Sequence, residues 1–172
     1  MKQLLKYILS QLLEHQKIAE TKHSVGIALA GGLAVIITSF ITSTTVIVKI
    51  FAIISLVFCL LSLMFSFLAV SSKLISIKVK RKTNKSINYL YFEDIKNFTP
   101  KAFLGGIAKA YNFPAEYEPD VFEMDLAKTI IITSKRISSK YNLFNISTTF
   151  LIFSMVIMFV GGIFGGMGGI LF

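Results

Sequence analysis

Long apolar stretches alternate with polar segments along this chain. A helix needs about 20 apolar residues to cross the roughly 30 Å hydrocarbon core of a membrane, and three stretches are long enough. The pattern therefore predicts membrane-spanning helices at residues 23–43, 49–71 and 144–171. Outside them are an N-terminal segment, residues 1–22, and a central segment, residues 72–143.

Residues 1–22 have the periodicity of an amphipathic helix. Their apolar side chains come as doublets at four-residue spacing, at Leu4–Leu5, Ile8–Leu9 and Leu12–Leu13. Doublets at this spacing cover one face of a helix, while charged residues occupy most of the remaining circumference. Such a helix either lies in the lipid headgroup layer or packs on the central domain, and its fairly balanced charge favours packing.

The beginning of the central segment has the pattern of two strands. Ile75, Ile77 and Val79 alternate with polar residues, which is the period of a half-buried strand. Residues 81–85 are polar and turn-like, and residues 87–92 (INYLYF) are β-branched and aromatic. The pattern predicts a β-hairpin directly after the second span.

Two helix starts follow the expected hairpin. Thr99 and Pro100 are the N-cap and first-turn proline of a short helix. Asp120 and Glu123 form a variant of the capping box for a second helix. Because no proline occurs from Val121 onward, one helix of about 50 residues, roughly 75 Å long, can continue into the third span.

Together these elements predict a mainly α-helical membrane protein with a small α+β domain, residues 72–143, between the second and third spans. The composition agrees, since 54% of the residues are hydrophobic and 16% are charged, against about 25% charged residues in soluble domains. This excludes an ordinary soluble enzyme domain. The segments outside the spans are also too short for an independent catalytic domain.

Charge predicts the orientation. Lysine and arginine number 18 against 9 acidic residues, for a formal net charge of +9. Nearly all of these cations lie before the first span or between the second and the third. Because cations accumulate on the cytoplasmic side of membrane helices, we expect the N-terminus and the central domain in the cytoplasm and the C-terminus outside.

Small and hydroxyl-bearing residues recur inside the expected spans. Small residues at helical spacing let helix backbones approach closely in lipid. The candidates for such packing are Gly31, Gly161, Gly162, Gly165 and Gly166. Dense glycines near the C-terminus also weaken a helix, so a kinked or frayed end is the alternative. Ser55, Ser62 and Ser66 share one face of the second span, where they either pack against a neighbouring helix or line a pore.

The sequence has no pattern typical of a catalytic or metal site. His15 and His23 stand alone, and the single cysteine, Cys59, has no partner for a disulfide or a metal site. The acids between residues 116 and 125 surround a helix start, where the helix dipole favours negative charge. We therefore expect no enzymatic activity, no metal and no cofactor.

Basic and aromatic residues occur together in the central segment. Such a group can bind phosphate by charge and stack a base on a ring. The candidate nucleotide-binding residues are Lys80, Arg81, Lys82, Lys85, Tyr91, Arg136 and Lys140. The alternative is that these cations only follow the positive-inside bias and contact anionic lipid headgroups.

Four segments carry a family pattern over nearly the whole chain. They are AETKHSVGIALAGGLAVI at residues 19–36, NYLYFEDI at 88–95, FTPKAFL at 98–104 and DLAKTIIITSKRISSKYNLFNIS at 125–147. In this order they resemble the Pycsar transmembrane effector family, although His23 and Ser24 stand where that family more often has a small apolar pair. The resemblance implies an antiphage effector in the bacterial inner membrane, encoded beside a nucleotide second-messenger synthase. Family members are linked to cyclic pyrimidine nucleotides.

Pattern and resemblance together predict an oligomeric channel or pore that a nucleotide signal opens or holds shut, and that impairs the inner membrane. The expected partners are a nucleotide from a neighbouring nucleotidyltransferase or cyclase, membrane lipids, and further copies of the chain. A tetramer is the working number, and duplex nucleic acid is not an expected partner. The rival hypothesis is a non-conducting membrane anchor that recruits a soluble partner protein.

Overall fold

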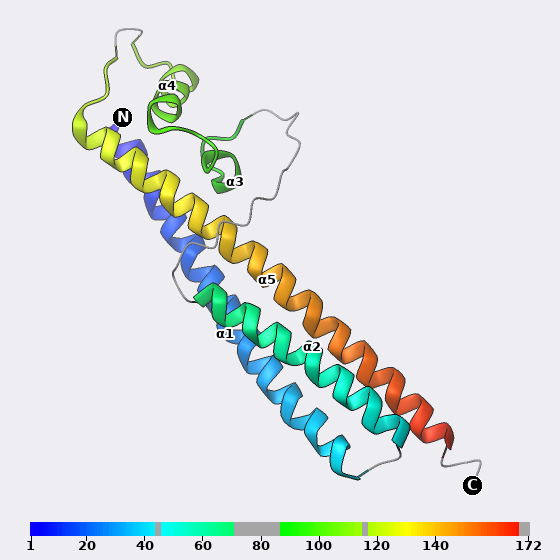
Figure 1. Ribbon diagram of the computed structural model, residues 1–172. Coiled ribbons are helices and arrows are strands. Elements are labelled where there is room, and N and C mark those ends of the chain that lie inside the picture. The colour runs from blue at the N-terminus through cyan, green and yellow to red at the C-terminus, as the bar shows by residue number, and fades with distance from the viewer. Residues whose placement is uncertain (44–45, 71–86, 115–116, 169–172) are drawn as a thin grey trace. The chain divides into compact units, whose positions relative to one another are not determined.

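The computed structural model describes residues 1–43, 46–70, 87–114 and 117–168. All regular secondary structure in these residues is helical (Figure 1). The helices are α1 (Lys2–Ser43), α2 (Val46–Val70), α3 (Phe92–Ile95), α4 (Pro100–Ala110) and α5 (Val121–Gly168). Among them, α1, α2 and α5 contain stretches that are long and apolar enough to cross a membrane.

Local caps explain where two of the helices begin. At α4 the Thr99 hydroxyl accepts a hydrogen bond from the backbone N–H of Ala102 at 3.3 Å, and Pro100 occupies the first helical position. At α5 the Asp120 carboxylate accepts from the Glu123 N–H at 2.7 Å, and the Glu123 carboxylate accepts from the Asp120 N–H at 3.2 Å. These bonds satisfy backbone donors that have no partner within the helix, and they confirm both predicted caps.

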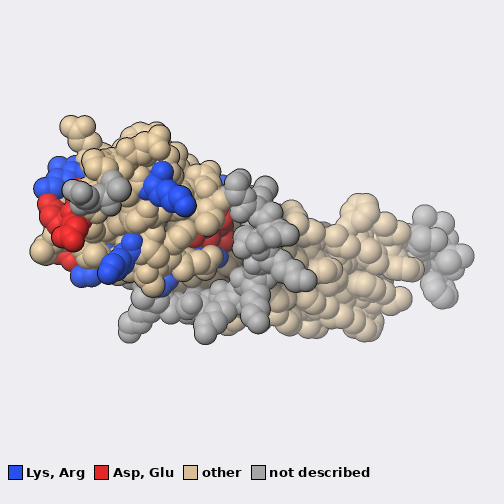
Figure 2. All heavy atoms as spheres, turned by 90° about the horizontal axis from the view of Figure 1, so that it is seen from above, with Lys and Arg blue, Asp and Glu red and all other residues tan. Residues whose placement is uncertain are grey.

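The chain divides into two compact units. The first unit consists of Met1–Ala19 and Lys73–Tyr141, and the second of Glu20–Ser72 and Asn142–Phe172. Helices α1 and α5 therefore each contribute residues to both units. Figure 2 shows charged side chains concentrated over the first unit, whereas most of the visible surface of the second unit is free of them.

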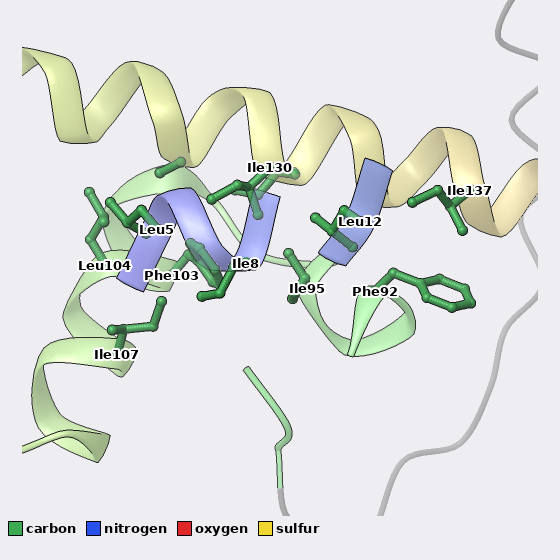
Figure 3. Close-up of a cluster of buried hydrophobic side chains, with 12 residues drawn as sticks. Leu5, Ile8, Leu12, Phe92, Ile95, Phe103, Leu104, Ile107, Ile130 and Ile137 are labelled. Atoms are coloured by element: carbon green, nitrogen blue, oxygen red, sulfur yellow. The ribbon is translucent and has the colours of Figure 1, made fainter. Parts of the chain in front are cut away.

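The core of the first unit combines one face of each of its helices. Leu5, Ile8 and Leu12 of α1 are at most 1% exposed. They belong to one cluster with Ile95 of α3, with Phe103, Leu104 and Ile107 of α4, and with Ile130 and Ile137 of α5 (Figure 3). Of the two predicted locations for the apolar stripe of the N-terminal segment, the structure therefore has the one in a protein core and not the one in the headgroup layer.

The second unit is apolar on the outside and buries small and polar side chains. Val35, Val46 and Phe159 expose 71%, 73% and 71% of their surface, whereas Ala30 and Ala52 are fully buried. Lipid tails favour apolar side chains and leave polar groups without hydrogen-bond partners. This distribution therefore suits helices surrounded by lipid.

The predicted β-hairpin is wrong where the structure can be compared with it. Residues 73–85, its first strand and turn, lie outside the described residues. Residues 87–92 contain a turn, in which the Tyr91 N–H donates to the Asn88 carbonyl at 3.2 Å and the Leu90 N–H donates to the Asn88 side chain at 2.9 Å. An asparagine bonded to the backbone two residues ahead competes with strand pairing. The described part of the small domain is therefore helical and not α+β.

The aromatic residues of this segment serve the core of the first unit. The Tyr89 ring lies 5.7 Å from Phe98 and 6.4 Å from Phe103, measured between centroids. A Cβ atom added to Gly106 would come within 2.5 Å of the Tyr89 hydroxyl oxygen. Gly106 weakens α4 as a helix, but it leaves the room that the Tyr89 ring occupies.

Candidate functional site

Four rings meet around α3 in the first unit. The Phe92 ring is central, at 5.8 Å from His15 of α1, 4.8 Å from Tyr91 and 5.5 Å from Tyr141 of α5, measured between centroids. Phe92 and Tyr141 are stacked, with 12° between their planes. Phe92 is 8% exposed, whereas Tyr91 is 42% exposed. Tyr91 is therefore the open member of this ring cluster, which consists of His15, Tyr91, Phe92 and Tyr141.

A partly buried lysine connects the segment after α3 to α5. Lys96 Nζ donates to the Glu93 carboxylate at 2.8 Å and to the Ser138 hydroxyl at 2.7 Å. The side chains of Lys96 and Glu93 are 18% and 19% exposed, so water and salt screen this ion pair less than an exposed one. The Lys96 N–H also donates to the Phe92 carbonyl at 3.0 Å. A partly dehydrated cation thus lies one helical turn from the centre of the ring cluster.

Helix α5 carries an exposed lysine, Lys135, one turn before Ser138. Positions three residues apart are neighbours on a helix surface, so Lys135, Ser138 and Tyr141 follow one strip of α5. Ser138 contacts Lys96 and Tyr141 stacks on Phe92, which puts the strip beside α3. Lys135 is exposed at the next position of the strip. The rings and Lys96 can together stack a planar base and attract an anion, and Lys135 adds positive charge to this side of α5.

The structure brings one of the predicted nucleotide-binding residues into this site, namely Tyr91. Arg136 and Lys140 do lie on α5, but each residue of a helix turns by about 100°. Both are therefore roughly 160° around the helix from Ser138, on the side away from Lys96. The remaining predicted residues lie outside the described part of the chain: Lys80, Arg81, Lys82 and Lys85. Their binding role stays a prediction.

Sequence reasoning missed Glu93, Lys96 and Ser138. A signal for the first two is present, because they are three residues apart, which is the spacing of an ion pair on a helix. Because no helix is predicted from the sequence at residues 93–96, the spacing alone does not indicate an ion pair there. No local pattern indicates Ser138, which is 42 residues away from Lys96 in the sequence.

Hydroxyl groups link α2 to α5 in the second unit. The Ser55 and Ser154 hydroxyls each donate to the other residue's backbone carbonyl at 2.8 Å. Further along, the Ser147 hydroxyl donates to the Ser62 carbonyl at 2.9 Å. The Ser147 oxygen also lies 3.0 Å from the Ser62 hydroxyl and 2.7 Å from the Ser66 hydroxyl. These five serines, called the serine ladder below, are at most 3% exposed.

All three predicted pore-lining residues belong to the serine ladder. Ser55, Ser62 and Ser66 share one face of α2, and within a single chain their hydroxyls bond to α5. They can line a pore only in a state in which α2 and α5 have separated along the ladder. Pore lining therefore stays a prediction about an assembly, and the single chain uses these serines for helix packing.

The glycines expected to pack are of two kinds. A Cβ atom added to Gly161 would lie 2.5 Å from Cβ of Phe51, so this glycine lets α5 approach α2 within the chain. A Cβ atom added to Gly31 or Gly162 would meet nothing within 4 Å. These two positions therefore have room for another chain. Packing stays a prediction for the two remaining candidates, Gly165 and Gly166.

The start of α5 holds a buried carboxylate beside a tyrosine. Glu123 is 5% exposed and accepts a hydrogen bond from the Tyr117 hydroxyl. Burial raises the pKa of Tyr117, and the Glu123 carboxylate raises it further. Lys2 Nζ lies 2.6 Å from the Asp120 carboxylate, and its hydrogen bond lowers the pKa of Asp120. These groups stabilise the cap, and no cluster of three or more His, Cys, Asp or Glu among the described residues could hold a metal ion.

A family model extends over nearly the whole chain. The Pycsar effector protein domain matches residues 4–165, a range that contains the ring cluster, Lys96 and the serine ladder. No curated protein and no solved structure matches the chain. The roles of individual residues therefore rest on the geometry described above.

Proposed function

Since the chain belongs to the Pycsar effector family, we propose that it forms a membrane channel or pore gated by a nucleotide. Membership makes the protein an antiphage membrane effector, and the family implies a second messenger made by a nucleotide cyclase. Channel activity and direct nucleotide binding are the two steps that the proposal adds. We further propose that the protein acts without catalysing a reaction.

The observation that carries the proposal is the division of polar groups between the two units. The first unit holds the ring cluster and Lys96, which suit a base and a phosphate. The second unit is apolar outside and buries the serine ladder between α2 and α5. If α2 and α5 separate in an assembly, the ladder exposes hydroxyls that water in a pore can bond. Sensing therefore belongs to the first unit and conduction to the second.

Conduction requires several copies of the chain. Three membrane helices are too few to enclose a pore, so the proposed channel is a homo-oligomer, with a tetramer as the working number. The open space beside Gly31 and Gly162 supports contacts between copies, since small residues let helices approach closely in lipid. The cationic segments before the first span and between the second and third would face the cytoplasmic leaflet of the bacterial inner membrane.

The proposal is tested by measuring leakage from liposomes that contain the purified full-length protein. Cyclic UMP, cyclic CMP and a set of cyclic dinucleotides are added in turn, with the linear monophosphates as matched controls. We expect one cyclic nucleotide to change the rate of ion leakage severalfold, while its linear form does not. Single-channel recording on planar bilayers then measures the conductance directly.

The possible results separate the proposal from its rival. If a nucleotide binds but leakage never differs from that of protein-free liposomes, the channel hypothesis is wrong and a non-conducting anchor is favoured. If leakage occurs but no nucleotide changes it or binds, nucleotide gating is wrong.

A further inference from the structure

Lys96 is a cation that retains the capacity to bind another anion. A lysine ammonium group carries three N–H donors. In the structure the Glu93 carboxylate and the Ser138 hydroxyl engage it, at 2.8 Å and 2.7 Å. The side chain still exposes 18% of its surface. A small anion can therefore reach Lys96 without opening the core of the unit.

Glu93 occupies the place that a bound anion would take. Its carboxylate carries one negative charge and contacts Lys96 directly. Partly buried ion pairs stabilise a fold little, because the loss of hydration offsets the attraction. A phosphate group that replaces the carboxylate has to offset the loss of the Glu93 contact. It can do so because it carries more charge and because its additional oxygens could accept a hydrogen bond from the Ser138 hydroxyl.

The ring cluster supplies a surface for a base at the other end of α3. The Ile95 N–H donates to the Tyr91 carbonyl at 3.1 Å, so Tyr91 and Lys96 flank the single turn of α3. Tyr91 is 42% exposed, and its ring contacts the Phe92 ring in a tilted arrangement, with 4.8 Å between centroids and 50° between planes. A ring held in this way can stack a planar base while Lys96 binds the phosphate joined to that base.

We propose that Lys96 is the phosphate-binding residue of the nucleotide site, and that Glu93 is a built-in competitor which occupies Lys96 until the nucleotide displaces it. The inference rests on the proposed function, in which a nucleotide is the signal. Binding breaks the Glu93–Lys96 ion pair of the ligand-free chain. The competitor thus sets the concentration at which the nucleotide is sensed.

Two substitutions in the same ion pair should shift affinity in opposite directions. Binding of cyclic UMP and cyclic CMP to the full-length protein in detergent is measured by calorimetry. Lys96→Gln should weaken binding roughly tenfold to a hundredfold, because a charge-assisted phosphate contact is lost. Glu93→Gln should strengthen binding severalfold, because the neutral amide no longer competes for the ammonium group. Lys101→Gln, an exposed lysine on α4, should change the affinity less than twofold.

Each result supports or overturns the inference. A merely structural ion pair predicts that Glu93→Gln and Lys96→Gln both weaken binding, or that neither changes it, and either result overturns the inference alone. If wild-type protein binds neither these two nucleotides nor the cyclic dinucleotides of the leakage assay, the proposed nucleotide signal fails and the inference falls with it. Lys96→Arg keeps the charge, so a variant that folds but does not bind would contradict a charge-based phosphate contact. Thermal unfolding of every variant verifies that it is folded.

Discussion

Replacing Ser147 with alanine should loosen α5 from α2. Ser147 donates to the Ser62 carbonyl and contacts the hydroxyls of Ser62 and Ser66. Hydrogen bonds between membrane helices average about 0.6 kcal/mol each, so three independent contacts would contribute about 2 kcal/mol. The two freed hydroxyls of α2 can turn to carbonyls one turn earlier in their own helix. We therefore expect the free energy of unfolding to fall by about 1 kcal/mol.

The measurement is the free energy of unfolding in detergent micelles, obtained by steric trapping of a doubly tagged chain. Thr149→Ala is the matched control, since it also removes a hydroxyl from α5. The Thr149 hydroxyl is exposed and donates to the Asn145 carbonyl of the same helix at 2.8 Å. Because no contact between helices is lost, this variant should change stability by less than about 0.5 kcal/mol.

A double-mutant cycle isolates the contact between the two helices. Ser66→Ala is combined with Ser147→Ala, and the coupling between them should be at least about 0.5 kcal/mol for residues in direct contact. If Ser147→Ala is as stable as the Thr149→Ala control and the cycle has no coupling, the serine ladder does not hold α2 and α5 together. In that case the polar face of α2 needs another explanation.

Three further predictions concern orientation, assembly and pH. A reporter fused after Phe172 should lie outside the cytoplasm and one inserted near Thr83 inside, and a cytoplasmic C-terminus would contradict the three-span topology. Gly162→Leu should reduce the oligomer mass measured in detergent by light scattering without lowering the unfolding temperature. Gly161→Leu should lower the unfolding temperature because its side chain would collide with Phe51. Equal effects of the two variants would show that both glycines pack within the chain. The hydrogen bond from Lys2 keeps the pKa of Asp120 below its ordinary value, so the stabilisation is present above the unfolded pKa of about 3.9 and is lost as the pH falls through the lower folded pKa. The unfolding temperature should therefore fall less steeply between about pH 5 and pH 2 for Asp120→Asn than for wild type. Parallel curves of unfolding temperature against pH would show that the Lys2–Asp120 pair contributes nothing to stability.

The sequence by itself determined the features that depend on neighbours along the chain. A membrane-spanning stretch is recognised by its length and apolar composition, because the cost of placing a segment in lipid depends on those two properties. The caps at Thr99 and at Asp120–Glu123 join residues three apart, so their residue types are enough to predict them. The polar face of α2 was predictable for the same reason, since helical periodicity is local.

The conformation of residues 87–92 was decided by the tertiary structure. β-branched and aromatic residues favour strands because they fit a half-buried surface. A turn or a helix can also present these residues to a half-buried surface. In the core of the first unit, Tyr89 packs on Phe98 and Phe103 from a turn. The Asn88 side chain then accepts from the Leu90 N–H, a backbone donor that a strand would have paired. Composition alone does not distinguish these two environments.

Only the tertiary structure decided which polar groups meet. Lys96 forms a hydrogen bond with Ser138, which is 42 residues away in the sequence, and Ser66 forms one with Ser147, which is 81 residues away. A serine hydroxyl can bond water in a pore or an oxygen of a neighbouring helix, so the same stripe on α2 suits both roles. Packing α5 against that stripe excludes solvent, and the buried hydroxyls then bond to each other because an unpaired polar group in a low-dielectric interior is costly.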